Sequence, residues 1–102
     1  MTTPAPPIAD EAFELAARCL RVLAHADRLR IVDLLSQRRM TVGELADELG
    51  RAPAAVSQHL NHMRAHRLLD AQRDGRAVYY RVTNPHATNV IRCIRRHGPG
   101  TD

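Results

Sequence analysis

The side chains best suited to recognising another molecule lie in one helical segment, residues 53–67. Three apolar residues recur there at helical spacing and predict its buried side: Val56, Leu60 and Met63. Helical rotation places small and amide residues on the opposite side: Ala54, Gln58, Asn61 and Ala65. Glutamine and asparagine can each form two hydrogen bonds with an adenine edge, and small residues let a helix enter the major groove. The pattern therefore favours base reading by Gln58 and Asn61 over an ordinary solvated surface.

Further polar residues surround this predicted face. Ser57 and His62 lie on its flanks, while Arg51 and Arg64 offer guanidinium groups near the two ends of the segment. We add these four residues to the predicted DNA-binding set: the two arginines because guanidinium groups suit phosphate contacts, and Ser57 and His62 because they flank the predicted face. His59 lies closer to the apolar side, and we expect it to be packed or to touch phosphate rather than to read a base.

The charge of the chain is unevenly distributed. All 15 basic residues are arginine. Residues 1–50 hold six arginines and eight acids, whereas residues 51–102 hold nine arginines and three acids. A basic half rich in arginine favours a nucleic-acid partner, with a merely solvated basic surface as the alternative.

Arginines also flank a predicted turn. Arg73 and Arg76 enclose Asp74-Gly75, a strong signal for a β-hairpin, and the residues on either side alternate as strands do. Arginines near the tip of a two-stranded ribbon suit backbone phosphates or a minor groove. The alternative is an exposed hairpin whose charges only prevent edge pairing.

Five helices and one hairpin are needed to position these side chains. Periodicity predicts helices over about 10–23, 28–37, 41–49 and 53–67, strands within 69–82, and a last helix over about 86–97. Thr41 and Glu44 fit a capping box, and Asp27 is the expected cap of the second helix. The third and fourth helices, joined through Gly50, form a helix-turn-helix, and the hairpin becomes its wing. The expected fold is mainly α with a small β-hairpin: a winged helix-turn-helix.

One domain, residues 9–97, follows from this pattern, because 102 residues suit a single core. We expect residues 1–8, with three prolines, to form a disordered tail and residues 98–102 to form a flexible one. The first and last helices carry more apolar surface than so small a core can cover: Ala12, Ala16, Cys19, Leu20 and Leu23, then Val90, Ile91 and Ile94. This excess predicts a homodimer.

Four segments together resemble the ArsR/SmtB family of dimeric bacterial winged-helix repressors: Leu23–Leu35, Val42–Ala46, Val56–Leu60 and Asp74–Tyr80. The resemblance covers roughly residues 12–97. It implies a dimer formed by the first and last helices, a double-stranded operator as partner, and release from that operator when an inducer binds.

The resemblance also directs attention to metal sites. Some family members carry Cys-x-Cys after a Glu-Leu pair, but Glu44-Leu45 is followed here by Ala46, Asp47 and Glu48, so these thiolates are missing. His86 and His97 lie 11 residues apart, on nearly the same helical face but separated by about 16 Å. In an antiparallel pair of helices, His86 of one copy meets His97 of the other.

This spacing is similar to the family's inter-subunit zinc-type and nickel-type site. Asn84 stands where that site has an aspartate, and Gly100 where it has a further histidine or acid, with Asp102 nearby as a substitute. We therefore expect either a weak nickel or zinc site, with Asn84 as a poor third ligand, or histidines remaining from a decayed site. No cofactor is expected to be required.

Two other modes of regulation remain open. Some family members sense oxidants or persulfide with a cysteine pair, and Cys19 and Cys93 are the candidates for such a pair here. A second alternative is a member without a small-molecule inducer, controlled by a partner protein.

Other classes of protein are excluded by what the chain lacks. The histidines and acids show no set of nucleophile, base and orienting group, so we expect no enzyme. No apolar run approaches the roughly 18 residues of a membrane span, and no signal peptide is evident at the start. Two cysteines do not staple a small secreted fold, so we expect a cytoplasmic location without membrane contact.

Overall fold

The protein forms a winged helix-turn-helix. The computed structural model describes residues 3–98 of the chain. Its elements are α1 (Asp10–Leu23), α2 (Ala26–Gln37), α3 (Val42–Leu49), α4 (Pro53–Ala65), β1 (Leu69–Asp74), β2 (Ala77–Val82) and α5 (Pro85–His97). This order confirms the expected fold, and every element lies inside the predicted domain of residues 9–97. Residues 3–8 contain no helix or strand, while residues 1–2 and 99–102 of the predicted tails lie outside the described residues.

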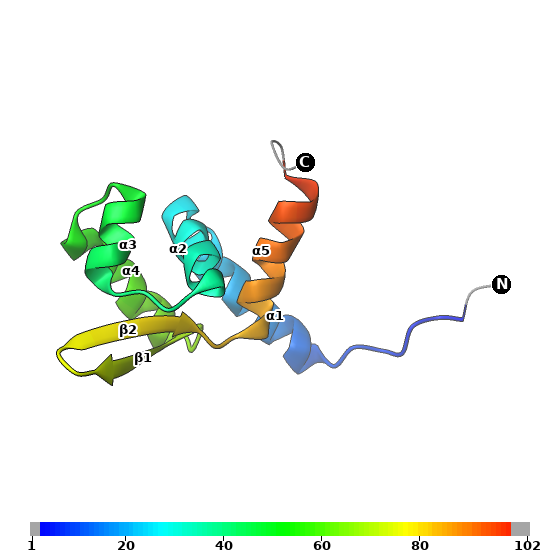
Figure 1. Ribbon diagram of the computed structural model, residues 1–102. Coiled ribbons are helices and arrows are strands. Elements are labelled where there is room, and N and C mark those ends of the chain that lie inside the picture. The colour runs from blue at the N-terminus through cyan, green and yellow to red at the C-terminus, as the bar shows by residue number, and fades with distance from the viewer. Residues whose placement is uncertain (1–2, 99–102) are drawn as a thin grey trace.

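The molecule has two ends with different contents (Figure 1). Helices α1 and α5 contact each other at one end, while α3 and the tip of the hairpin lie at the other. Helix α2 runs between them and contacts α1, α3, α5 and β2. An apolar core joins all the elements, and its fully buried large side chains are Leu23, Ile31, Val32, Met40, Leu45, Val56, Leu60, Met63 and Leu68.

Local signals in the sequence set most helix ends. Thr41 and Glu44 form the predicted capping box at the start of α3, and Gly50 ends that helix in the left-handed region with φ 65°. Pro53 opens α4, where a missing amide hydrogen costs nothing. Asn84 caps α5 through its side-chain oxygen. The prediction for α2 was wrong, because His25 caps this helix and Asp27 lies inside its first turn.

The hairpin is antiparallel and closes at the predicted turn. Asp74 pairs with Ala77, and Gly75 adopts φ 64°, which favours glycine. Met40 adds a short bridge to Tyr80, which ties the base of the wing to the chain between α2 and α3. The wing is therefore anchored at its base, while its tip extends away from the core (Figure 1).

Candidate nucleic-acid interface

Helix α4 presents its polar face to solvent as the sequence indicates. Val56, Leu60 and Met63 are all buried, whereas the opposite positions are all exposed: Ala54, Gln58, Asn61 and Ala65. His62 and Arg64 are also exposed, and Ser57 is half-buried. The exposed face holds no long acidic side chain, so it is free to lie against an anionic polymer.

The turn between α3 and α4 fixes the direction of this face. Gly50 leads out of α3, and the backbone amide of Arg51 donates to the carbonyl of Ala46 at 3.2 Å. A Cβ on Gly50 would meet nothing within 4 Å, so the requirement for glycine comes from the positive φ and not from crowding. The short, capped helix α3 thus holds α4 at a fixed angle.

A polar cluster joins α4 to the helices behind it. Arg28 on α2 donates from Nε to Nδ1 of His59 at 3.1 Å and from Nη1 to the carbonyl of Val22 at 3.0 Å. The His25 ring lies edge-on to His59, with the ring centroids 4.5 Å apart. Burial, and then electrostatic repulsion from His25 and Arg28, lower the pKa of His59, so the neutral ring accepts the guanidinium hydrogen. His59 is therefore packed, as its position on the helix predicts, and it positions α4.

Asp27 adds a second link at the same place. Its carboxylate accepts from Nε of Arg51 at 3.0 Å and from Nη1 of Arg30 at 2.7 Å. The hydrogen bond from Arg51 is the largest cause that lowers the pKa of Asp27. Arg51, predicted to touch DNA, is thus held against α2 through Nε.

This cluster also has the composition of a metal site. Ligand atoms of His25, Asp27 and His59 lie within 4.8 Å of one another, and two imidazoles with a carboxylate would suit zinc. However, Nδ1 of His25 accepts from the amide of Asp27, and the other two ligands accept from arginines. A metal ion would have to displace these hydrogen bonds among several guanidinium groups. We therefore interpret the cluster as a structural link between α2 and α4.

The wing carries arginines without partners. Arg73 and Arg76 make neither a salt bridge nor a side-chain hydrogen bond within residues 3–98, and the same holds for Arg64 on α4. Arg39 instead pairs with Asp74 at 2.9 Å and lies over the Tyr79 ring at 4.1 Å. Asp74 in the turn is therefore neutralised by Arg39, and Arg73 and Arg76 near the tip remain available for phosphate.

The predicted metal ligands of α5 do not meet within one chain. His86 and His97 are both exposed, at opposite ends of the helix. The side-chain oxygen of Asn84 accepts from the amide of His86 at 2.9 Å, so its principal role is that of a helix cap. Among residues 3–98 neither histidine belongs to a group of three close ligands, and Gly100 and Asp102 lie outside the described residues.

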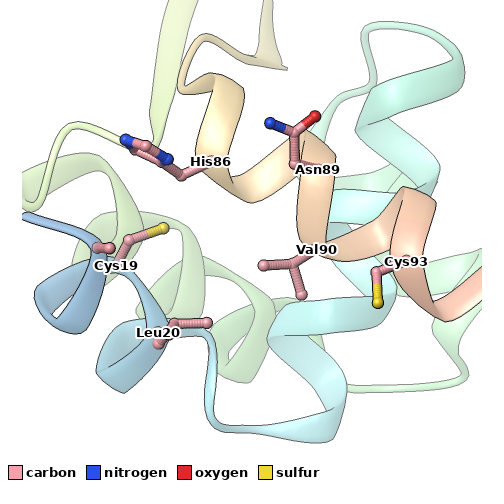
Figure 2. A pocket seen from close by; sticks show the side chains of 7 residues that line it. Cys19, Leu20, His86, Asn89, Val90 and Cys93 are labelled. Atoms are coloured by element: carbon pink, nitrogen blue, oxygen red, sulfur yellow. The ribbon is translucent and has the colours of Figure 1, made fainter. Parts of the chain in front are cut away.

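The two cysteines line one cavity between α1 and α5 (Figure 2). Its volume is about 280 Å³, and its other lining residues are Ala16, Leu20, His86, Asn89 and Val90. Both cysteines are free thiols; Cys19 is buried and Cys93 is exposed. Burial raises the pKa of the Cys19 thiol, which lowers its fraction of reactive thiolate. In Figure 2 the side chain of Val90 is drawn between the two sulfur atoms.

Sequence reasoning missed the roles of two residues at this interface. His25 and Arg28 were assigned to a helix break and a helix, not to the support of α4. The available signal was their type: a histidine and an arginine beside an apolar helix face, with another histidine near the core side of α4. Whether these side chains contact each other depends on the angle at which α2 crosses α4, and local sequence patterns do not determine that angle.

Fold and surface together define a class of protein. A helix-turn-helix with an exposed amide face, followed by a wing whose Arg73 and Arg76 have no side-chain partner within residues 3–98, is the architecture of a winged-helix protein that binds nucleic acid. No helix within residues 3–98 has both the length and the apolar character needed to cross a membrane.

Known proteins identify the family. Residues 25–71 match the model of the arsR family of bacterial regulatory proteins. The nodulation protein NolR of Rhizobium meliloti is 35% identical over 97% of this chain and 82% of its own length. The regulator KmtR of Mycobacterium tuberculosis is 36% identical over 83% of this chain, which spans 65% of KmtR.

A solved structure extends the match. A homodimeric winged helix-turn-helix DNA-binding domain from Mycobacterium bovis, Mb0332, superposes with a TM-score of 0.73 at 25% identity, over 90% of this chain and 88% of that one. The chain belongs to the ArsR/SmtB family. It is a DNA-binding transcriptional regulator, and its family is one of regulators and not of enzymes.

Proposed function

We propose that the protein is a homodimeric repressor that binds operator DNA through α4 and the wing. The observation that carries this proposal is the exposed amide face of α4 beside unpaired arginines in the hairpin. Gln58 and Asn61 read base edges, with Ala54 allowing close approach to the groove. Phosphates are bound by the surrounding polar side chains: Arg51, Ser57, His62, Arg64, Arg73 and Arg76.

A second copy covers the apolar surface at the α1–α5 end. Phe13, Leu15 and Leu20 on α1 are 59%, 54% and 54% exposed, and Ile94 on α5 is 44% exposed. Large apolar side chains at such exposure, gathered on two adjacent helices, favour burial against another protein surface. The homodimeric Mb0332 domain supports a second copy as the occupant. A two-fold dimer would present two copies of α4 to successive major grooves.

The inducer in this proposal is a divalent metal such as nickel or zinc, bound between the two copies. Each ion would take His86 from one copy and His97 from the other, and water would complete the shell, because Asn84 is engaged as a cap. This two-imidazole site would be weaker than a full four-ligand site. The raised pKa of Cys19 disfavours the alternative of a thiol sensor. If a partner protein controls DNA binding instead, neither metal titration nor the cysteine variants should change it.

Two measurements test this proposal. Selection of bound duplexes from a random library should return a two-fold symmetric sequence, and failure to enrich any sequence would reject sequence-specific repression. Zinc or nickel titrated into the selected complex should then release the protein. His97→Ala should abolish that release, while Cys93→Ser should not. Loss of the response only in Cys19→Ser or Cys93→Ser would transfer the inducer site to the thiols.

A further inference from the structure

A basic groove that shares only His62 with the predicted DNA-binding set lies between α1 and the C-terminal half of α4. Its volume is about 300 Å³, and its lining residues are Arg18, Arg21, Val22, His62 and His66. Four of these five side chains are basic, and no acid among residues 3–98 lines the groove. We call this hollow the α1–α4 groove.

The two arginines of the groove are without partners. Arg18 and Arg21 make no salt bridge and no side-chain hydrogen bond within the described chain. They lie three residues apart on α1, so both side chains leave the helix on the same face. Eight other arginines of the protein have such partners: Arg28, Arg30, Arg38, Arg39, Arg51, Arg81, Arg92 and Arg95. The groove therefore concentrates positive charge that residues 3–98 do not neutralise.

The two histidines add donors to the groove when their rings are protonated. Nδ1 of His66 lies 3.0 Å from the carbonyl of His62, so this nitrogen donates to the backbone, and Nε2 donates to an anion only in the protonated ring. The ring centroids of His62 and His66 lie 4.7 Å apart. Partial desolvation, and then electrostatic repulsion from Arg28 and His66, lower the pKa of His62. Further positive charge is thus unfavourable here, and a bound anion would relieve that repulsion.

The basic lining continues into a neighbouring cavity. This second hollow, of about 630 Å³, shares Arg18 and His66 with the groove and adds Arg67 and His86. Its remaining lining residues are neutral: Leu15, Cys19, Leu68, Asn84 and Pro85. Arg67, like Arg18, has no hydrogen-bond or ion-pair partner for its side chain in the described part of the chain. The described residues of both linings include no acid, so the positive potential extends from the groove into this cavity.

We propose that the α1–α4 groove binds a phosphate-type oxyanion, through the guanidinium groups of Arg18 and Arg21 and the imidazoles of His62 and His66. Two guanidinium forks suit the tetrahedral oxygens of phosphate better than a single charge does. The source is either a backbone phosphate of bound DNA or a free anion. His62 lies one helical turn after Gln58, so DNA lying along α4 brings backbone phosphates to this side. The DNA arm rests on the proposed function, whereas the free-anion arm does not.

The free-anion arm is measured without DNA. Inorganic phosphate is titrated into the full-length protein at constant pH and ionic strength, and the histidine ring resonances are followed by NMR. The resonances of His62 and His66 should move saturably, and those of His97, outside the groove, should not. Arg18→Gln combined with Arg21→Gln should abolish the saturable shift, whereas Arg96→Gln, which removes another unpaired charge, should leave it intact.

The DNA arm uses a random-sequence duplex and the same variants. If backbone phosphate is the source, the double variant should reduce the slope of log K against log salt by about 0.9 for each phosphate that is no longer neutralised, and Arg96→Gln should leave it unchanged. The single variant Arg18→Lys should reduce the slope less than the double variant does, because lysine keeps the positive charge and lacks only the guanidinium fork. A thermal midpoint equal to that of the parent would show that the double variant is folded.

The outcomes separate the sources and the two proposals. A saturable response to inorganic phosphate identifies a free anion, and a changed slope alone identifies DNA. If the folded double variant changes neither measurement, the inference is overturned. If the parent protein shows the saturable response to phosphate while Gln58→Ala and Arg76→Gln leave DNA binding unchanged, the proposed DNA interface is wrong and the anion groove is supported.

Discussion

At the scale of single residues, the arginines divide into those that hold the fold and those that remain available to a partner. Arg28 is used internally, against His59, whereas Arg51 holds Asp27 through Nε and is also proposed to bind phosphate. Arg73 and Arg76 have no internal partner within residues 3–98. Residue type alone did not separate these roles, because the separation depends on which acid or ring lies within reach after folding.

The first prediction concerns the wing. Arg76→Gln should weaken binding to all duplex sequences alike and reduce the salt slope by about 0.9 for each phosphate that the wing no longer neutralises. The reason is that an arginine on a phosphate positions the protein without reading a base. Binding measured at several salt concentrations checks this, with Arg96→Gln as the matched removal of one charge. A variant with poorer discrimination between sequences and an unchanged salt slope would show that Arg76 reads bases instead.

A second prediction follows from the packed histidine. The pKa of His59 is lowered in the folded protein, so the unfolded chain binds the proton more readily. Stability is therefore complete above the unfolded pKa of about 6.5 and decreases as pH falls through that value toward the folded pKa. Chemical denaturation between about pH 7.5 and 5 measures this.

The matched variant isolates this residue. His59→Gln should have a flatter stability profile over the same range, although His62, whose pKa is also lowered, leaves some slope. The lowered pKa values of Asp27 and Glu44 act in a separate window, because these carboxylates lose their stabilising partners only as pH falls below about 4. An identical slope near pH 6 in parent and variant would contradict the assigned role of His59.

At the scale of elements, the local sequence predicts helix starts and turns, whereas the buried side of a helix also depends on how the elements pack. Thr41 with Glu44, Pro53 and Asp74-Gly75 each fix a helix start or a turn through their own backbone, and all act as predicted. The apolar stripe predicted on α1 divides between the core and the surface: Cys19 and Leu23 are buried and Leu20 is exposed, while Val22, outside the stripe, is buried. A helix with apolar residues on several sides does not reveal which side meets the core of its own chain.

The prediction for an element concerns the turn that orients α4. Gly50→Ala should lower the free energy of unfolding by about 1 kcal/mol, because alanine is strained at a φ of 65°. Gly43→Ala is the matched control: Gly43 lies in the first turn of α3, and an added Cβ would come no nearer than 3.9 Å to Thr41. This control should raise stability by roughly 0.5–1 kcal/mol. Urea unfolding would compare the two, and equal effects would remove the special role of Gly50.

At the scale of the whole molecule, the two ends carry different kinds of surface. The wing and α4 carry unpaired arginines and the amide face, whereas α1 and α5 carry the exposed apolar side chains. The excess of apolar residues on the terminal helices was visible in the sequence, but its division between core and outer surface required the crossing of α1 with α5. In the proposed metal site each ion takes one histidine from each copy, so a single chain shows only half of the ligands of one site.

The prediction at this scale is that Ile94→Glu yields monomers. A carboxylate on the outer face of α5 would be desolvated in the interface without a partner, which destabilises the dimer. Sedimentation would report the mass, and DNA binding should weaken because one α4 replaces two. Ile8→Glu, at an exposed position outside the helices, should remain dimeric. A dimeric Ile94→Glu variant with parental DNA binding would refute this interface.

The central claim is that the exposed face of α4 reads bases, and sequence discrimination by Gln58→Ala tests it most directly. The ratio of affinities for a selected operator and a random duplex is measured at one salt concentration. Gln37→Ala, an exposed glutamine at the end of α2, is the control. We predict that Gln58→Ala lowers this ratio by a factor that corresponds to about 1–3 kcal/mol of binding free energy per half-site, the value of one bidentate pair of hydrogen bonds. Gln37→Ala should leave the ratio unchanged. An undiminished ratio in Gln58→Ala would contradict the claim.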